Sequence, residues 1–386
     1  MQLATVSESE LAVMRQHELE VQELAQGLQR LLIVRLSSMG DVIHALPAVM
    51  LLRRAFPSAT LGWMIEERWS ELLCAPGTPR LGPRCAGRPL VDAVHAVNTQ
   101  AWRSAAFSDE TWREALASWR ELRAADYELA IDFQGAVRTA LMGRWTGTPA
   151  LIGFESPREH AASLFYTHTV AAVGVHVIEQ NASLAAAVAG APAELSPVEF
   201  PLDISIQESC DRHLRQHQMQ QFAILNPGAG WLAKQWPAEG YGEVAQGLRE
   251  LGLRSLVNFG PGEEGVARAV EQASAGAAEA VPCSLSELIA FTRRAQLFVG
   301  GDTGPMHLAA ALGVPVIALF GPTSPTRNGP FGTRNVVLRS PLSSATESSA
   351  RAAARSSRKR QDAGLLAITP QQVLGAARQL LGSSLA

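Results

Sequence analysis

The sequence predicts an α/β protein with two Rossmann-like domains, and three observations support that fold class. Short apolar runs alternate with segments whose apolar residues recur every three or four positions, which is the helical spacing. Such alternation favours parallel sheets covered by helices on both faces. The pattern occurs twice in the 386 residues, and a stretch that contains three prolines, Gly190–Pro201, separates the two series.

The first series begins at an apolar run near residue 31. We expect a buried strand at Leu31–Leu36, a tight loop, and then a helix from Val42, with Pro47 better suited to its first turn than to its interior. Further strands are expected at 61–65, 127–133 and 151–154, and helices at 110–123 and 137–145. The second series predicts strands at 222–225, 255–259, 297–299 and 316–320, and helices at 239–251, 263–273, 285–294 and 306–312.

These patterns divide the chain into six segments. Residues 1–29 form an extension in which the spacing of Leu11, Met14 and Leu19 is compatible with a helix. Two domains, 30–190 and 202–340, are joined by a linker at 191–201. Residues 341–363 are rich in Ser, Ala and Arg and have too few large apolar side chains to form a core, so we expect them to be mobile. A C-terminal segment, 364–386, contains the last predicted helix, Gln371–Leu381.

Charge and cysteine content argue against several classes of function. The net charge is −3 and the pI about 6.3, which gives no reason to expect nucleic-acid binding. The four cysteines form no C-x-x-C pair, and we find no zinc-like spacing of His and Cys, so we expect free thiols and no metal site.

The longest apolar run, 308–321, is broken by Gly313 and Pro315 and is shorter than the roughly 20 residues that span a bilayer. The first 29 residues lack a signal peptide's apolar core, so we expect a cytoplasmic protein.

The loop after the first predicted strand, Ser37–Asp41, offers a glycine and a carboxylate. Gly40 lets backbone approach a ligand closely. Asp41 stands at a predicted helix start, where it serves either as a helix cap or as a base that accepts a proton from a sugar hydroxyl. The loop has no G-x-G-x-x-G pattern, which weighs against a dinucleotide-dependent oxidoreductase.

Three further glycine-containing turns follow predicted strands in the second series. The turn Gly300–His307 opens a helix, with Pro305 suited to the first helical position, and predicts an anion site; its alternative is a turn capped by Asp302 or Thr303. The turn 226–230 precedes Lys234 and suggests a phosphate contact. In the turn 260–264, an acidic residue either binds a ribose or complements the helix dipole.

Isolated cations and histidines complete the set of candidate residues. One or two of four arginines are expected to meet an anionic acceptor; these are Arg68, Arg138, Arg144 and Arg158. Three single histidines suit core or surface roles better than metal ligation; these are His44, His176 and His307. The chain has no Asp-x-Asp pair for a nucleotide-bound metal, which favours stabilisation of a leaving group by protein groups.

Several of these segments together resemble the lipopolysaccharide heptosyltransferases of glycosyltransferase family 9, and heptosyltransferase I most. The two long matches are LLIVRLSSMGDVIHALPAV at Leu31–Val49 and FVGGDTGPMHLAAALGVPVIALFGPTSP at Phe298–Pro325. Shorter matches lie between them, namely IDFQG at 131–135, REHAASLFY at 158–166 and AKQWP at 233–237. The resemblance runs from about residue 31 to residue 332.

That resemblance implies a GT-B fold, in which two Rossmann-like domains with parallel sheets face each other across a cleft. The domain at 30–190 would bind the acceptor and the domain at 202–340 the nucleotide sugar. It implies an inverting transfer, without metal or cofactor, of L-glycero-D-manno-heptose from ADP-heptose to a Kdo residue of Kdo-lipid A. It also implies a cytoplasmic protein, peripheral to the inner leaflet of the inner membrane, and we expect a monomer that binds no nucleic acid.

The resemblance assigns roles to individual residues. Asp41 matches the general base, and Lys234 the catalytic cation near the donor phosphates. Donor-binding positions are Gly40, Gly230, Glu264, Asp302, Thr303, Gly304 and His307, with Glu263 as the neighbouring alternative to Glu264. Arg158 and Arg138 are expected to face the acceptor.

The chain departs from the family pattern in three places, and two other functions stay open. Residues 1–29 and the Ser/Ala/Arg-rich stretch after Ser340 are atypical, and Ala229 and Gly230 replace threonines near the phosphates. The alternatives are a family 9 enzyme with another nucleotide sugar or acceptor, and a nucleotide-sugar-binding protein without catalysis. The presence of Asp41, Lys234 and Asp302 argues against the second.

Overall fold

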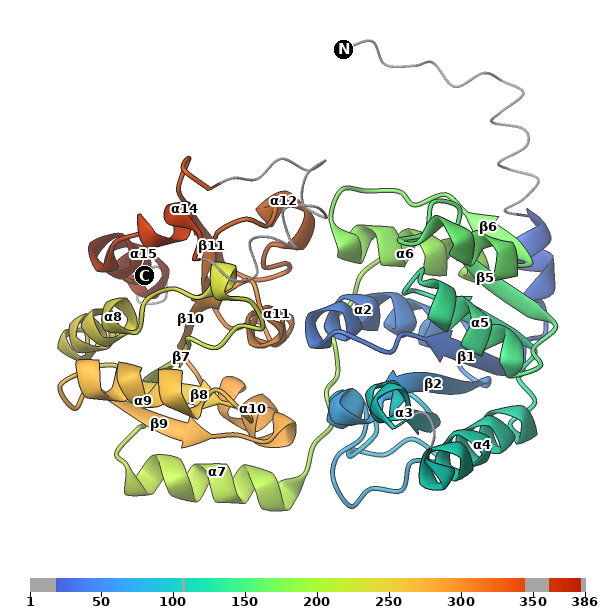
Figure 1. The fold of residues 1–386 in the computed structure, drawn as a ribbon, viewed down its shortest axis with the longest axis horizontal. Helices are drawn as coiled ribbons and strands as arrows, with labels where there is room; N and C mark the ends of the chain where they lie inside the picture. The colour runs from blue at the N-terminus through green and yellow to red at the C-terminus, as the bar shows by residue number, and fades with distance from the viewer. Residues whose placement is uncertain (1–18, 106–107, 344–360, 383–386) are drawn as a thin grey trace, which may run out of the picture. The chain divides into compact units, whose positions relative to one another are not determined.

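The computed structural model describes residues 19–105, 108–343 and 361–382. The chain divides into two compact units, Met1–Pro201 and Leu202–Ala386. Each unit contains a six-stranded sheet with helices on both faces (Figure 1). Every pairing between neighbouring strands of the two sheets is parallel.

The sheet of the first unit has the strand order β3-β2-β1-β4-β5-β6. Its strands are β1 (Arg30–Val34), β2 (Thr60–Glu66), β3 (Ala93–Val97), β4 (Leu129–Asp132), β5 (Ala150–Phe154) and β6 (His168–Val170). This is the doubly wound order of a Rossmann fold, in which the direction of strand addition reverses between β1 and β4. Ligands bind such sheets beyond the carboxyl ends of the strands at that reversal.

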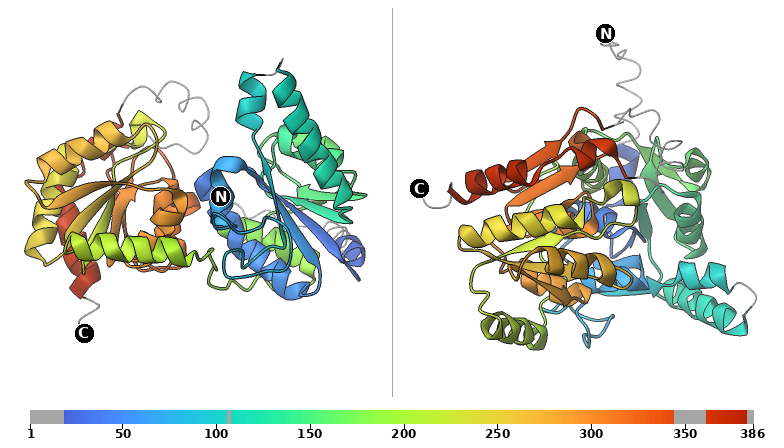
Figure 2. Two further views of the ribbon diagram at one scale, coloured as in Figure 1. Left: turned by 90° about the horizontal axis from the view of Figure 1, so that it is seen from below. Right: turned by 60° about the vertical axis from the view of Figure 1, so that its left-hand side comes forward.

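Helices cover both faces of this sheet. On one face α2 (Met39–Ala55) packs along α6 (Val177–Ala189). On the other face lie α4 (Asp109–Ala124) and α5 (Val137–Trp145) (Figure 2). Side chains of these two helices pack with Leu32 and Val34 of β1. Short elements complete the unit: η1 (Glu67–Leu72), α3 (Thr99–Ser104) and η2 (His160–Phe165).

Pro47 lies inside α2, so the expectation that it suits the first turn is wrong. Proline lacks an N–H and crowds the carbonyl four residues earlier, which weakens the local helical hydrogen bonds. Packing compensates here, because α2 is buried along most of its length and Asn181 of α6 donates to the His44 carbonyl at 3.0 Å. Tertiary contacts therefore keep the helix continuous through the proline.

The described part of the N-terminal extension belongs to the first unit. Residues 19–24 are helical, and Val21, Ala25 and Leu28 are buried. Leu19, which the expected helical spacing included, is 59% exposed. Leu11 and Met14 lie outside the described residues.

The second unit repeats the same topology, with the strand order β12-β11-β10-β7-β8-β9. Its strands are β7 (Phe222–Asn226), β8 (Arg254–Phe259), β9 (Ala278–Pro282), β10 (Leu297–Gly301), β11 (Val316–Phe320) and β12 (Asn335–Arg339). The reversal falls between β7 and β10, which are neighbours. The ligand edge of this sheet is therefore the carboxyl end of these two strands.

Alternation along β7 separates two hydrophobic clusters. Ala223 and Leu225 pack with α8 (Ala238–Glu250), α9 (Glu264–Ala273) and α15 (Pro370–Gly382). Phe222 and Ile224 pack with helices on the opposite face, namely α7 (Ile204–Gln216), α10 (Leu285–Thr292) and α11 (Gly304–Ala311). Short elements are η3 (Leu232–Lys234), α12 (Pro325–Asn328) and α14 (Ala363–Leu366).

The C-terminal helices are part of this core. Leu365 and Val373 are completely buried, and the Trp236 indole N–H donates to the Ile368 carbonyl at 3.0 Å. Of the segment predicted to be mobile, residues 344–360 lie outside the described residues. Its described ends meet, because the Ser343 hydroxyl donates to Asp362 at 3.0 Å.

The described ranges contain no helix that is both long enough and apolar enough to cross a membrane.

Candidate active site

Three loops meet at the ligand edge of the first sheet. They follow β1, β4 and β5, which are neighbours in the sheet. Each loop carries one of the motifs recognised in the sequence: Ser37–Asp41, then 131–135, then 158–166. The carboxyl ends of parallel strands lie at one edge, so the topology brings these separate motifs together.

Asp41 lies in the first turn of α2, three residues after the N-cap, which is Ser38. One carboxylate oxygen accepts from both the Ser38 N–H and the Ser38 hydroxyl, each at 3.0 Å. The other oxygen is 2.7 Å from the Arg35 guanidinium. The interpretation of Asp41 as the cap itself is therefore wrong, since the carboxylate bonds back to the cap from the third helical position.

The surroundings of Asp41 keep it ionised. Burial acts to raise its pKa, but the charge of Arg35 and the hydrogen bond from the Ser38 N–H outweigh burial and lower the pKa to about 2. The side chain is 35% exposed, whereas that of Arg35 is 8% exposed. The site thus presents a fixed carboxylate that remains partly accessible.

Arg35 connects three elements and was missed by the sequence predictions. Its guanidinium donates to the Phe133 carbonyl beyond β4 and pairs with Asp41 on α2. Its own carbonyl accepts from the Trp63 indole of β2 at 3.0 Å. A charged residue within the apolar run 31–36 was the available signal, because a buried charge needs a partner.

The second loop is organised around Asp132, which is completely buried. Burial raises the pKa of Asp132, and hydrogen bonds that stabilise the carboxylate oppose this effect. The donors are the Gln134 N–H at 2.8 Å, the Tyr166 hydroxyl at 2.9 Å, the Thr139 hydroxyl at 3.0 Å and the Gly135 N–H at 3.3 Å. The Gln134 side chain accepts from the Leu36 N–H at 2.9 Å, which ties this loop to the one that carries Asp41.

Arg138 lies in the first turn of α5, directly after the second loop, and Arg158 lies on the third loop. Arg138 is half-buried on α5 and donates to the Thr99 hydroxyl at 3.1 Å; burial and the nearby Arg103 lower its pKa. Arg158 is exposed, and its backbone packs over Gly135, where an added Cβ would lie 2.9 Å from the Arg158 nitrogen. The two cations therefore belong to neighbouring segments at the ligand edge, one at the start of α5 and one on the loop after β5.

The other two arginines considered from the sequence are placed differently. Arg144 belongs to the last turn of α5 and donates to the Thr148 carbonyl at 3.4 Å. Because α5 runs away from the carboxyl end of β4, that turn lies toward the opposite edge of the sheet. Arg68 lies over the Trp69 ring, 5.0 Å from its centroid.

At the ligand edge of the second sheet, Asn226 links three strand ends. Its amide donates to the Gly228 carbonyl at 3.0 Å and to the Thr303 hydroxyl at 3.2 Å. Its side-chain oxygen accepts from Asn258, at the end of β8, at 3.0 Å. These bonds fix the turns that follow β7 and β10 relative to each other.

Lys234, Asp302 and His307 form a largely buried polar cluster beside these turns. Lys234 Nζ is 2.7 Å from the Asp302 carboxylate and 3.0 Å from the Asp302 carbonyl, and His307 Nε2 is 3.2 Å from the other carboxylate oxygen. Burial would raise the pKa of Asp302, but His307 and Lys234 together hold it well below its usual range. Asp302 therefore fixes the position of the lysine ammonium.

Two glycines let the Lys234 segment lie close to the sheet. A Cβ on Gly301 would be 2.9 Å from the Lys234 carbonyl, and one on Gly321 would be 3.1 Å from the Ala233 carbonyl. Any other residue at either position would push η3 outward. Gly230 differs, because an added Cβ would have no heavy atom within 4 Å, so the turn that it belongs to borders open space.

The predicted helix opening at 303–307 is present. Thr303 is the N-cap of α11 and Gly304 is its first residue, so Pro305 occupies the second helical position and not the expected first. Its missing N–H costs no hydrogen bond there, because the first-turn N–H groups have no intrahelical acceptor. The first N–H groups of a helix have no intrahelical acceptor, and the helix dipole places positive charge at this end. Asp302, which holds the Lys234 ammonium, directly precedes the N-cap of α11. The start of α11 therefore suits an anion.

Glu263 and Glu264 are placed differently. Glu263 bonds within its own loop, accepting from the Gly260 N–H at 3.2 Å, and its carboxylate crowds the Cβ position of Gly228. Glu264 begins α9, and its side chain is 70% exposed at 3.9 Å from Arg268. Glu263 therefore supports the turn beside Gly228, and Glu264 presents an accessible carboxylate.

One pair of histidines was not considered in the sequence analysis. His213 and His217 are four residues apart, and both lie close to Glu279 of β9. The search of the sequence for zinc-like spacing was directed at combined His and Cys clusters, and this pair contains no cysteine. The H-x-x-x-H spacing was the available signal, since it places both rings on one face of a helix.

Two Rossmann-like units, one with a carboxylate at its ligand edge and one with glycine-containing turns beside a lysine, have the architecture of a glycosyltransferase of the GT-B class. The family model for glycosyltransferase family 9 (heptosyltransferase) matches residues 115–356. Lipopolysaccharide heptosyltransferase 1 of Pseudomonas aeruginosa is 32% identical over 317 residues, which is 80% of this chain and 83% of that protein. Lipopolysaccharide heptosyltransferase 1 of Escherichia coli K12 is 31% identical, over 81% of this chain and 94% of that protein.

Solved structures agree with these matches. E. coli heptosyltransferase WaaC with ADP-2-deoxy-2-fluoro heptose is 27% identical with a TM-score of 0.68, over 92% of this chain and 100% of that one. The chain belongs to glycosyltransferase family 9, the heptosyltransferases.

Proposed function

We propose that this protein transfers L-glycero-D-manno-heptose from ADP-heptose to a Kdo residue of Kdo-lipid A, with inversion, during synthesis of the lipopolysaccharide inner core. The relatives named lipopolysaccharide heptosyltransferase 1, at 31–32% identity over most of the chain, support this choice. The observation that carries the proposal is the ionised carboxylate of Asp41 at the ligand edge of the first sheet. An inverting transfer requires one base on the acceptor hydroxyl, and the first unit offers one there.

In the proposed reaction, Asp41 takes the proton of a Kdo hydroxyl. The hydroxyl oxygen forms a bond to the anomeric carbon from the face opposite ADP, and the bond from that carbon to the phosphate oxygen breaks. ADP leaves with the electron pair. One carboxylate suffices, whereas glycoside hydrolases require a pair. Because the pKa of Asp41 is low, it accepts the proton only as the hydroxyl oxygen becomes acidic during attack.

The donor diphosphate is proposed to bind the second unit. Lys234 and the N–H groups at the start of α11, near Thr303 and Gly304, would stabilise negative charge as it develops on ADP. Asp302 and His307 would hold the lysine in position. Gly230, next to open space, would let the backbone approach the phosphates. Gly40, the second residue of α2, is also proposed to contact the donor.

The donor ribose is proposed to bind Glu264. The carboxyl end of the second strand is where an acidic residue binds ribose in Rossmann sites, and β8 is that strand in this unit. Glu264 follows β8 and is exposed, whereas Glu263 is already used within its loop. Glu263 remains the alternative.

The acceptor is proposed to contact Arg138 and Arg158. Kdo is a sugar acid, and a guanidinium pairs with a carboxylate through two parallel hydrogen bonds. Arg138 begins α5 after β4 and Arg158 follows β5, so both lie at the edge of the sheet that holds Asp41. A cation beside the base would also restrict which hydroxyl of the Kdo unit reaches it.

We propose that the transfer needs neither metal nor cofactor. The support is that Lys234 and the α11 N-terminus place positive charge where the diphosphate would bind.

We also propose that the protein acts at the cytoplasmic face of the inner membrane, because its acceptor is a lipid, and that it acts there as a monomer. A family 9 enzyme with another nucleotide sugar or acceptor is the alternative.

Incubation of the purified protein with ADP-heptose and Kdo-lipid A, followed by mass spectrometry, tests the proposal. The expected product carries one additional heptose, and NMR of its anomeric proton should show the inverted configuration. The same assay with chelator tests metal independence, and ADP-glucose serves as the control donor. Transfer from ADP-glucose at an equal rate, or no transfer from ADP-heptose, would overturn the choice of donor.

A further inference from the structure

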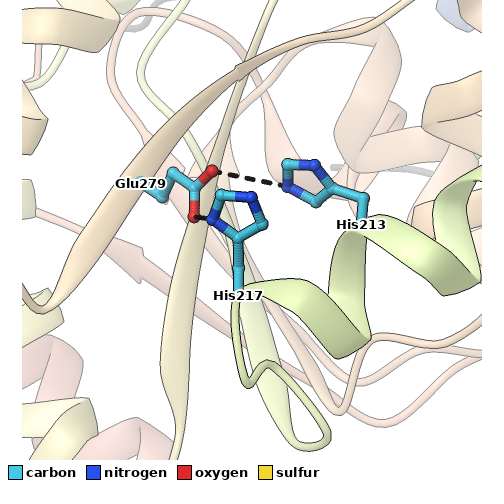
Figure 3. A group of neighbouring side chains, drawn as sticks. All are labelled: His213, His217 and Glu279. Atoms are coloured by element: carbon cyan, nitrogen blue, oxygen red, sulfur yellow. Dashed lines mark ion pairs between the residues drawn. The ribbon is translucent and has the colours of Figure 1, made fainter.

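We propose that His213, His217 and Glu279 form a binding site for a divalent transition metal ion, with Zn²⁺ preferred. The two histidines lie at the end of α7, and Glu279 projects toward them from β9 (Figure 3). The site belongs entirely to the second unit and does not depend on the proposed reaction. Three features carry the proposal: the convergence of the ligand atoms, an unsatisfied buried nitrogen, and the position in the fold.

The three side chains already converge. His217 Nδ1 is 2.8 Å from one oxygen of Glu279, and His213 Nε2 is 3.5 Å from the other. The imidazole rings are stacked, with centroids 4.3 Å apart and an angle of 16° between their planes. One ligand atom from each residue lies within 4.8 Å of the other two. Ligands of a tetrahedral zinc ion are about 3.4 Å apart, so small side-chain rotations suffice.

The His213 Nε2 atom lacks a hydrogen bond within the described part of the chain, although it is buried. Its separation from the Glu279 oxygen is long for a hydrogen bond. A buried nitrogen without a partner costs free energy, and protein structures rarely leave one unsatisfied. An ion between this nitrogen and the carboxylate would satisfy both. Phe291 packs edge-on against the ring, with centroids 5.7 Å apart, and limits its movement.

The ligand types determine which ions fit. Two imidazole nitrogens and one carboxylate oxygen are ligands that Zn²⁺ binds at about 2.0–2.2 Å, whereas Ca²⁺ and Mg²⁺ prefer oxygen ligands. Three protein ligands leave a fourth tetrahedral position for water. His217 is the C-cap of α7, where the helix dipole also favours a cation.

The position in the fold indicates a structural role. Glu279 pairs with Leu256 near the start of β8, while Asn226, Asn258 and Gly301 lie at the opposite, carboxyl ends of their strands. An ion here would therefore be remote from the proposed donor site. It would join α7, the first helix of the second unit, to β9, which is an edge strand of the sheet.

Zinc titration of untagged full-length protein tests the proposal. Protein stripped with chelator is titrated with Zn²⁺ by calorimetry, and its thermal unfolding is followed with and without the ion. We expect one equivalent to bind and the unfolding temperature to rise, since a ligand specific for the native state stabilises it. Loss of even an outer-shell partner weakens metal affinity about 10- to 100-fold, so His217→Asn should weaken it by at least about 100-fold.

Two variants and one control complete the experiment. Glu279→Gln keeps the shape of the side chain and should weaken binding while preserving unfolding in chelator. His168→Asn removes a half-buried histidine of the first unit and should bind zinc as the wild type does. The proposal is overturned if the wild type binds no zinc at micromolar concentrations. It is equally overturned if His217→Asn and Glu279→Gln both retain wild-type affinity.

Discussion

The Arg35 guanidinium holds the Asp41 carboxylate at 2.7 Å, and the pair joins the end of β1 to the first turn of α2. Arg35 is buried and Asp41 is partly exposed, so the arginine faces the protein and the carboxylate faces the ligand edge. The arginine lowers the pKa of Asp41 and also fixes its direction. This arrangement provides an oriented carboxylate whose basicity is reduced.

Asp41→Asn should lower turnover by about 10²- to 10⁴-fold, which is the usual contribution of a general base. The amide retains the size of the side chain but cannot accept the proton. ADP affinity, measured by calorimetry, should not change, because the proposed donor contacts lie on the second unit. Asp126→Asn, at an exposed carboxylate paired with Arg30, is the matched control. Wild-type turnover in Asp41→Asn would leave Asp41 with only a structural role at the start of α2.

Arg35→Met should move the acid limb of the pH profile upward. In the wild type the pKa of Asp41 is lowered from 3.8 to about 2. Protonation of Asp41 should therefore not reduce kcat/KM at any pH above about 4. Without Arg35, burial dominates and raises the pKa of Asp41, so the inactive protonated form should appear at higher pH. Arg35→Lys retains the charge and should shift the limb less. Superimposable profiles for all three proteins would contradict an effect of Arg35 on catalysis.

The same shift affects stability. Because the folded pKa of Asp41 is depressed, its contribution to the free energy of unfolding is present above about pH 4 and is lost as pH falls toward 2. Urea unfolding of the wild type and of Asp41→Asn should therefore differ at pH 6 and converge toward pH 2. The difference should be about 1 kcal/mol or less, since partial exposure screens the pair. An equal difference at both pH values would exclude the ion pair as its cause.

Lys234→Ala should weaken ADP binding and slow the transfer. A charge-assisted contact to phosphate contributes about 1.5–3 kcal/mol, which corresponds to roughly 10- to 150-fold in affinity. Removal of Lys234 also leaves Asp302 buried with His307 as its remaining described ionic partner, so the unfolding temperature should fall. Lys234→Arg, which retains the charge, should recover part of the affinity. Unchanged ADP affinity in Lys234→Ala would remove Lys234 from the donor site.

Much of the fold follows from the periodicity of apolar residues. The predicted helix at 137–145 and the predicted strand at 316–320 have the bounds of α5 and β11. The helix α7 was missed because only Cys210 and Leu214 of its residues are buried, so its apolar face is narrow. Pro47 was misjudged because α6 stabilises α2 through a contact that no local pattern reveals.

The candidate site was predictable where residues follow strands directly. Asp41, Lys234 and Asp302 were chosen because glycine-containing turns at strand ends indicate ligand contacts, and their roles stay predictions. The direction of a side chain is set by packing, so the partners of Asp41 and the different placement of Glu263 and Glu264 required the structure. The Asn226 links likewise join residues that are 32 and 77 positions apart in sequence.

Glu264→Gln should weaken ADP binding while the thermal stability remains close to that of the wild type. The carboxylate is exposed, and its 3.9 Å pair with Arg268 is a surface contact of little energetic value. Glu263→Gln should instead lower the unfolding temperature, because the Gly260 N–H loses a charged acceptor. If calorimetry with ADP shows the larger affinity loss in Glu263→Gln, the ribose contact belongs to Glu263.

Attachment to the membrane is expected to depend on surface charge, since the proposed acceptor is a lipid and no described helix spans a bilayer. A basic run in the sequence is the expected contact, and each cation near an anionic leaflet contributes about 1 kcal/mol. Its members lie outside the described residues: Arg351, Arg355, Arg358, Lys359 and Arg360. Changing all five to Gln should reduce co-sedimentation with anionic vesicles at low salt, while turnover on detergent-dispersed acceptor stays at the wild-type level.

A second variant separates charge from apolar contact. Trp112 and Trp119 of α4 are 67% and 39% exposed, and tryptophan favours the membrane interface. Changing both to Gln should weaken co-sedimentation at high salt as well, because an apolar contact is not screened by salt. If the charge variant sediments like the wild type and the tryptophan variant does not, α4 carries the attachment and the basic run is irrelevant to it. If both sediment like the wild type, attachment resides in the acceptor contact itself, and adding Kdo-lipid A to the vesicles should then increase the bound fraction.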